Sequence, residues 1–219
     1  MYEDRLSHDG REKQARVRPG SEVPGENLGR IISLTDGVFA FALTLLVLGL
    51  TVPVVSSGGQ LGAQLQADWP KFLGYVFAFV MIAVWWTYHH RTFRYIERYD
   101  SVLMWANMAL LLEIAVMPFV LEVFTAYSGT QDAAILFAVI QIAAGLTLNF
   151  IWRYASSGHR LVDPKLSAAE IEYFAKWGLV TPALFAVSIG ISFLSVDAAE
   201  YSWVIAIVLR RLGQRYGPS

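Results

Sequence analysis

Five long apolar segments, separated by shorter polar stretches, dominate the pattern of this chain. They cover roughly residues 31–53, 70–90, 101–125, 132–154 and 173–195. As helices, each is long enough to cross a hydrocarbon layer about 30 Å thick. A sixth segment, roughly 198–212, is shorter, so it either crosses with little tilt or lies as a re-entrant or surface helix. The pattern predicts an all-α, polytopic membrane protein with six transmembrane helices per subunit.

The connections between these segments carry the residues expected of loops. The stretch between the first and second segments is rich in Gly, Ser and Gln, and Pro164 lies in the longer connection before the fifth. Ser167 followed by Glu170 predicts a capping box at the start of the fifth helix. Pro118 and Pro182 fall inside apolar segments, where we expect them to kink the helices.

Basic residues predict the orientation, because cytoplasmic loops of membrane proteins are enriched in Lys and Arg. Of the 17 basic residues, Lys71 alone falls on the outer side of the six-span arrangement. Both termini are therefore predicted to be cytoplasmic, and the membrane to be the cell inner (plasma) membrane. The predicted division is a cytoplasmic tail over 1–29, a six-helix transmembrane domain over 30–212 and a short cytoplasmic tail over 213–219.

Composition narrows the chemistry further. Apolar residues make up 55% of the chain and the mean hydropathy is +0.45, which places the protein in a lipid bilayer. A net charge of −1 gives no reason to expect a nucleic-acid partner. The chain has no cysteine, and its four histidines are too dispersed for a zinc motif. We therefore expect no cofactor, and no nucleophile or metal motif indicates an enzyme.

The first apolar segment contains Asp36, about 9 Å along the helix at 1.5 Å per residue. An ionised carboxylate at that depth costs several kcal/mol unless it is paired or hydrated. Depth along the second and third helices brings Trp86, His90 and Asn107 into the same slab, so these residues are predicted to form a polar network with Asp36. An interfacial belt is the alternative for the aromatic residues, and we expect it for Trp85 and His89.

A motif at this helix resembles a known family. The run Arg30-x-x-x-Leu34-Thr35-Asp36-Gly37-Val38-Phe39-Ala40 is similar to the R-x-x-x-F-S-D-G-V-F-A signature of the transmembrane-protein-175 family of potassium channels. Trp86 with His89 and His90, and Asn107 followed by Pro118-Phe119, also resemble that family. The resemblance covers residues 30–120, and beyond them only the helix count agrees. Two departures are Leu34-Thr35 for Phe-Ser, and Phe41 where the family usually has isoleucine or leucine.

The resemblance implies a homotetramer whose four first helices line a central, potassium-selective pore through which K⁺ permeates passively. The implied pore wall is Phe41, Thr44, Leu45 and Leu48, and residues 41, 45 and 48 share a helical stripe. Arg30 and Asp36 would brace the inner end of the helix bundle rather than bind the permeating ion. No TVGYG filter sequence occurs, so a hydrophobic constriction and a threonine ring would replace it.

Two alternatives remain open from the sequence. A proton-coupled secondary transporter could use Asp36, His90 and Glu113 as a relay. The apolar stripe of the first helix could also face lipid or pack against a neighbouring helix. Glu113 lies near the middle of the third helix, and we expect it to form a hydrogen bond with Gln141 of the fourth. The role of Glu113 is then either structural pairing or proton sensing.

Overall fold

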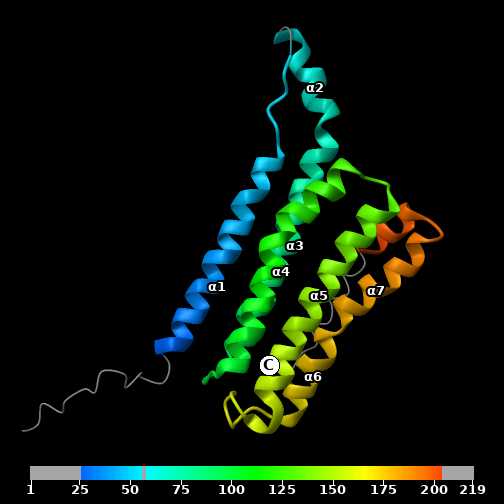
Figure 1. The fold of residues 1–219 in the computed structure, drawn as a ribbon. Coiled ribbons are helices and arrows are strands. Elements are labelled where there is room, and N and C mark those ends of the chain that lie inside the picture. Colours follow the sequence, from blue (N-terminus) through cyan, green and yellow to red (C-terminus); the bar gives the residue numbers. More distant parts are fainter. Residues whose placement is uncertain (1–25, 56–57, 204–219) are drawn as a thin grey trace, which may run out of the picture.

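A computed structural model describes residues 26–55 and 58–203 of the chain, and these residues form an elongated bundle of helices (Figure 1). Residues 46–49 continue the first helix as a short 3₁₀ turn, η1 (Leu46–Gly49). The long helices are α1 (Glu26–Leu45), α3 (Trp69–Phe93), α4 (Ser101–Ala126), α5 (Gln131–Ser156) and the consecutive pair α6 (Ala168–Gly178) and α7 (Val180–Ser192).

Five spans in the described residues are long and apolar enough to cross a membrane: Leu28–Gly49, Trp69–Phe93, Ser101–Ala126, Gln131–His159 and Ala168–Ser192. The five long segments read from the sequence are thereby confirmed as helices. α1 begins at Glu26, inside the segment 1–29 predicted to be a tail. Of the sixth predicted segment, residues 198–203 are helical, and the rest lies outside the described residues, as do both predicted tails apart from residues 26–29.

The connection between α1 and α3 contains a short helix that its composition did not predict. α2 (Leu61–Ala67) follows a 3₁₀ turn, η2 (Gly58–Gln60), and leads through Asp68 into α3. Figure 1 shows α2 projecting beyond the ends of the other helices. At the junction Lys71 Nζ lies 2.8 Å from Asp68 Oδ1. Hydrogen bonds from Lys71 and then Gln64 hold the pKa of Asp68 below its ordinary value.

The fifth span is broken into α6 and α7 at Leu179. Pro182 lacks a backbone N–H and its ring conflicts with the carbonyl four residues earlier, which belongs to Gly178, the last residue of α6. The predicted kink at Pro182 therefore coincides with a helix boundary. The predicted capping box is confirmed: the Glu170 N–H donates to Ser167 Oγ at 3.2 Å, and the Ser167 N–H donates to Glu170 Oε2 at 2.8 Å.

α4 is the central wall of the subunit, because it packs against α1 on one side and α5 on the other, while α7 packs on α5 (Figure 1). The core between these helices includes Leu110, Ile114 and Leu148, all fully buried. At Gly145 of α5, an added Cβ would lie 2.8 Å from Pro182 Cδ, so this glycine permits the close approach of α5 and α7.

The loops at the end of the bundle where α1 begins, the predicted cytoplasmic end, are clamped together by one carboxylate. Asp100 accepts from the Leu103 N–H at 3.0 Å as the N-cap of α4, and from the Tyr154 hydroxyl at 2.6 Å. Arg160 lies 3.4 Å from the same carboxylate. Partial burial raises the pKa of Asp100, but these three partners and the Val102 N–H together outweigh it, and the pKa is lowered overall.

Candidate functional site

α1 has one buried and one uncovered face within the subunit. Thr35, Phe39, Ala42 and Leu46 recur at helical spacing and are buried against α3 and α4. The residues predicted to form a pore wall lie on the uncovered side: the exposed fraction is 64% for Phe41 and 73% for Leu48, Thr44 is exposed and Leu45 is half-buried. The structure therefore brings the predicted stripe together on one free helix face.

The uncovered side of α1 holds an apolar groove and, separately, the exposed polar side chain of Thr44. A groove of about 410 Å³ runs beside α1 and is lined by Gly37, Phe41 and Leu45, with Ala115 of α4 on its other side. The Thr44 hydroxyl donates to the Phe41 carbonyl at 2.8 Å, a backbone contact common for threonine in helices. Because its hydrogen is used in this way, the hydroxyl oxygen of Thr44 is left to accept from, or coordinate, a group outside the subunit.

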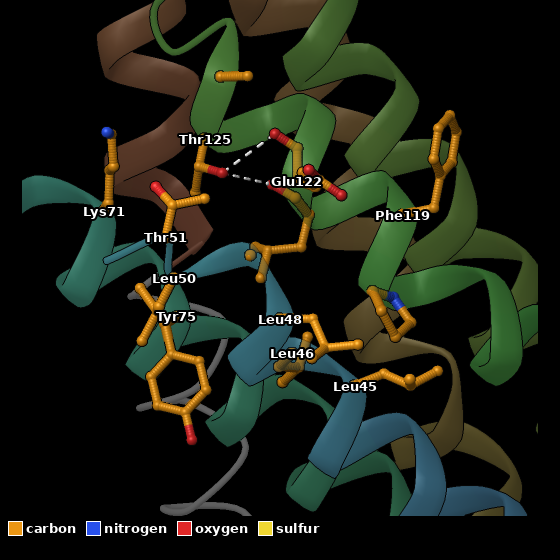
Figure 2. A pocket seen from close by; sticks show the side chains of 14 residues that line it. Leu45, Leu46, Leu48, Leu50, Thr51, Lys71, Tyr75, Phe119, Glu122 and Thr125 are labelled. Atoms are coloured by element: carbon orange, nitrogen blue, oxygen red, sulfur yellow. Dashed lines mark hydrogen bonds between the residues drawn. The ribbon is translucent and has the colours of Figure 1, made fainter. Parts of the chain in front are cut away.

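A second cavity, of about 350 Å³, lies at the far end of the same helix. Figure 2 shows it between Leu45 and Leu48 of the first span, Lys71 of α3 and Glu122 of α4. The Thr125 hydroxyl donates to the carbonyls of Leu121 and Glu122 at 3.0 and 3.1 Å and so stays within α4. Apolar α1 side chains thus meet a charged rim at the predicted outer end of the span.

At the other end of α1, Asp36 is held by an indole group. Trp86 Nε1 donates to Asp36 Oδ1 at 2.9 Å, and the Trp86 and His90 rings stack with centroids 5.4 Å apart. Asp36, Trp86 and His90 of the predicted network therefore lie together, on the exposed side of the α1–α3 contact. Arg30 is also exposed, and among the described residues no ion pair joins it to Asp36 within one subunit.

Asn107 was also predicted to belong to this network, but it lies in a separate network of hydrogen bonds that is fully buried. Its Nδ2 donates to Thr35 Oγ1 at 2.9 Å, because the Thr35 hydroxyl already donates to the Ile31 carbonyl at 2.8 Å. Asn107 Oδ1 lies 3.0 Å from His89 Nε2, which must then be the donor. This chain of bonds ties α1, α3 and α4 together at one point.

The interfacial placement predicted for His89 is therefore wrong, since only 1% of its surface is exposed. Helical spacing would have revealed this, because Ile82, Trp85 and His89 follow one another at three and four residues and all are buried. His90 lies on the next face. Thr35 was overlooked as a polar partner, although it follows Leu34 directly in the signature run.

The interfacial placement of Trp85 and the predicted Glu113–Gln141 hydrogen bond are also wrong. Trp85 is 1% exposed, and its Nε1 donates to Gln141 Oε1 at 2.6 Å. Glu113 instead accepts from the Thr147 hydroxyl at 2.8 Å. The prediction rested on Glu113 and Gln141 lying at the same depth in the membrane. Gln141 instead pairs with Trp85 of α3, and Glu113 pairs with Thr147, six residues beyond Gln141 on α5.

Comparison with known proteins identifies the family. A family model described as the endosomal/lysosomal potassium channel TMEM175 matches residues 30–118. A potassium channel of Chamaesiphon minutus is 33% identical over 182 residues, which span 80% of this chain and 89% of that protein. The chain belongs to the TMEM175 family. A potassium channel of Streptomyces collinus is 33% identical over 144 residues, spanning 64% of this chain and 70% of that protein.

Solved structures agree with the TMEM175 assignment. The crystal structure of a lysosomal potassium-selective channel TMEM175 homologue from Chamaesiphon minutus superposes with a TM-score of 0.73 at 30% identity, covering 85% of this chain and 98% of that one. The potassium channel MtTMEM175, at 17% identity and a TM-score of 0.61, shares the fold. The human relative, named an endosomal/lysosomal proton channel, is 25% identical over 33% of its length.

Membership in the TMEM175 family confirms the family resemblance, which was read over residues 30–120, and the assignment to a multi-pass membrane channel fold. It also agrees with the expectation that the chain is not an enzyme, because the family is one of ion channels. Between residues 26 and 203, leaving out 56–57, no group of three or more His, Asp or Glu side chains could hold a metal ion.

Proposed function

We propose that this chain is one subunit of a homotetrameric, potassium-selective channel of the cell inner membrane, with both termini in the cytoplasm. Support comes from the bacterial relatives of similar length, which are named potassium channels, and from the TMEM175 structures that the subunit resembles. The observation that carries the proposal is the uncovered stripe on α1 and η1, because Phe41 and Leu48 are apolar side chains that the subunit itself does not cover.

Four copies of that face around one axis enclose a narrow path. Phe41 forms a bulky apolar collar that excludes water and ions when the rings close, so it acts as a gate by dewetting. Thr44, nearly one turn further out, supplies four hydroxyl oxygens that replace part of the hydration shell of K⁺. Leu45 and Leu48 keep the path narrow beyond it. Selectivity then rests on side chains rather than on a filter of backbone carbonyls.

The two polar networks at the inner end of α1 act as braces in this proposal. The buried bonds of Thr35, Asn107 and His89 fix the rotation of α1 against α3 and α4. The hydrogen bond from Trp86 of α3 to Asp36 holds the neighbouring, exposed face of α1 against α3. Because removal of one partner would leave the other buried polar groups without a hydrogen bond, the network of Thr35, Asn107 and His89 has a single preferred arrangement. The two networks set which α1 residues face the axis.

A flux measurement in liposomes tests the function. The purified protein should dissipate a K⁺ gradient without any second ion or substrate, and much faster than an equal Na⁺ gradient. Flux that requires a proton gradient would instead support the second candidate, a proton-coupled transporter using Asp36, His90 and Glu113. One observation favours that candidate in part: Asp36 and His90 both contact Trp86. Glu113, by contrast, is engaged by Thr147 on another helix.

Orientation is tested separately. The chain has no cysteine, so single cysteines at Ser7, Ser57 and Ser219 report the side of the membrane on which each position lies. In intact cells an impermeant thiol reagent should label position 57 and leave 7 and 219 unlabelled until the membrane is opened. External labelling at position 7 or 219 contradicts cytoplasmic termini.

A further inference from the structure

Glu113 carries a buried carboxyl oxygen that nothing in the proposed pore uses. It lies at the middle of α4, between Ser101 and Ala126. Its Oε1 accepts from the Thr147 hydroxyl of α5 at 2.8 Å. Its Oε2 is enclosed and has no hydrogen-bond partner among the described residues. A glutamate thus sits at mid-membrane depth between two apolar helices, with one hydroxyl donor for two oxygens.

The charged and titratable groups on the neighbouring helices are engaged elsewhere. On the α1 and α3 side, Asp36 accepts from Trp86, and His89 bonds Asn107, which lies six residues from Glu113 along α4, or about 9 Å. On α5, Arg153 is six residues beyond Thr147 and donates from Nε to Asn149 Oδ1 at 3.0 Å. None of these groups forms an ion pair with Glu113 in the described part of the chain.

This arrangement suits a carboxylic acid and not a carboxylate. An ionised carboxylate within the bilayer needs a cation or several donors to replace the water it has lost, and a single threonine hydroxyl is too little. A neutral acid keeps the bond from Thr147 and places its proton on the enclosed Oε2. Leu110 and Met117, about one turn before and after the half-buried Glu113 on α4, are buried and apolar, so this part of the helix tolerates the neutral form and disfavours the charged one.

We propose that Glu113 is a proton-binding site at the α4–α5 contact, occupied at neutral pH, and that its proton holds α4 against α5. Deprotonation releases the proton to the aqueous phase and leaves a charge that draws water into the contact and separates the two helices. Because α4 also carries Asn107, which bonds Thr35 of α1, this separation disturbs the pore helix and lowers conduction. That last consequence rests on the proposed channel function, whereas the proton site does not.

Infrared difference spectroscopy of the protein in liposomes tests the site directly. The C=O stretch of a carboxylic acid is resolved from that of an ionised carboxylate. At pH 7, subtraction of Glu113→Gln from the unaltered protein should leave one carboxylic-acid band. Glu122→Gln, at the exposed outer end of the same helix, is the matched control and should retain that band. Thr147→Val should move the band to higher frequency, since the carbonyl loses its donor.

Flux as a function of pH tests the consequence. K⁺ flux through the unaltered protein should fall several-fold as the pH rises from about 7 to about 10, in parallel with the loss of the acid band. Flux through Glu113→Gln, which mimics the neutral acid, should stay constant over that range. A carboxylate band assigned to Glu113 at pH 7 overturns the proposal. An acid band with pH-independent flux keeps the proton site and overturns its control of the pore. Absence of flux in the unaltered protein refutes the channel function and leaves the infrared result to decide the site.

Discussion

The spans of α1 and α5 are almost equally apolar, yet the subunit surrounds them very differently. Within the most apolar stretch of each span, the buried share is 28% for the first span and 50% for the α5 span. α5 is enclosed by α4 and α7 and contributes fully buried residues such as Leu148. α1 buries one stripe and leaves Phe41 and Leu48 free. Apolar composition therefore indicates only that both helices cross the membrane. The buried fraction distinguishes α5, which forms part of the core, from α1, which keeps an exposed apolar face.

A matched pair of leucines should give the largest contrast in stability. Leu148→Ala removes a fully buried side chain of α5, and the cavity should lower the free energy of unfolding by about 2–5 kcal/mol. Leu48→Ala removes an exposed side chain of the first span and should change it by no more than about 0.5 kcal/mol. Thermal unfolding in one detergent measures both. Equal losses would mean that α1 is covered within the folded unit and that the contrast is false.

The buried bridge that ties α1 to α3 and α4 should come next in size. Asn107→Ala leaves Thr35 without its amide donor and His89 without its acceptor, at a cost of about 1–3 kcal/mol in unfolding free energy. Thr35→Val removes only the acceptor of the Asn107 amide and leaves the Asn107–His89 hydrogen bond in place, so it should lose less. The yield of folded tetramer in detergent is the measurement. If both variants assemble as well as the unaltered protein, the bridge does not position α1.

The carboxylate on the exposed side of α1 should act on assembly rather than on ion preference. Asp36→Ala removes the acceptor of the Trp86 indole and should reduce tetramer yield, at a cost of about 1–3 kcal/mol. Asp36→Asn retains an acceptor and serves as the control. Tetramer yield and the K⁺ to Na⁺ flux ratio are measured together. Normal assembly with loss of K⁺ preference would place Asp36 in the permeation path.

The uncovered face itself should respond in permeation and not in stability. Phe41→Ala opens the collar and should raise flux roughly tenfold, equivalent to about 1.4 kcal/mol of barrier, while relaxing K⁺ over Na⁺ discrimination. Thr44→Val removes the hydroxyl oxygen and should weaken discrimination with little gain in flux. Val187→Ala, on the exposed face of α7, is the control and should change neither. Unchanged ratios for both α1 variants, per folded tetramer, would remove this face from the pore.

The smallest effect belongs to the clamp that joins the end of α5 to the start of α4. The pKa of Asp100 is lowered in the folded state, so its contribution is complete above the ordinary value of 3.8 and is lost as the pH falls through the lowered value. Because the carboxylate is partly exposed, that contribution is at most about 1 kcal/mol. Tyr154→Phe should reduce the loss of stability on acidification below about pH 4, as measured by thermal unfolding against pH. An unchanged acid profile would show that Asp100 gains nothing from Tyr154.

The sequence was a reliable guide to the spans and a poorer one to their polar contacts. Length and apolar content sufficed for the five long helices, and the signature from Arg30 to Ala40 sufficed for the family. Pairing by depth failed for Glu113 and Gln141, because two groups at the same height bond only if their helices also turn them toward each other. Gln141 accepts a hydrogen bond from Trp85, a residue that we had predicted to lie at the membrane interface. Rotation about the helix axis is decided by packing, which hydropathy does not measure.

The arrangement of α2 and α4 has a consequence for where the chain can accept added residues. One residue inserted in α4 between Asn107 and Glu113 would turn the following half of that helix by about 100° and bring different side chains to face α5. α2, in contrast, buries no residue and projects beyond the bundle, so extra sequence there displaces no packed surface (Figure 1). A rigid tag or an antibody epitope placed in α2 would add mass outside the membrane layer for imaging, while leaving every helix contact described above in register.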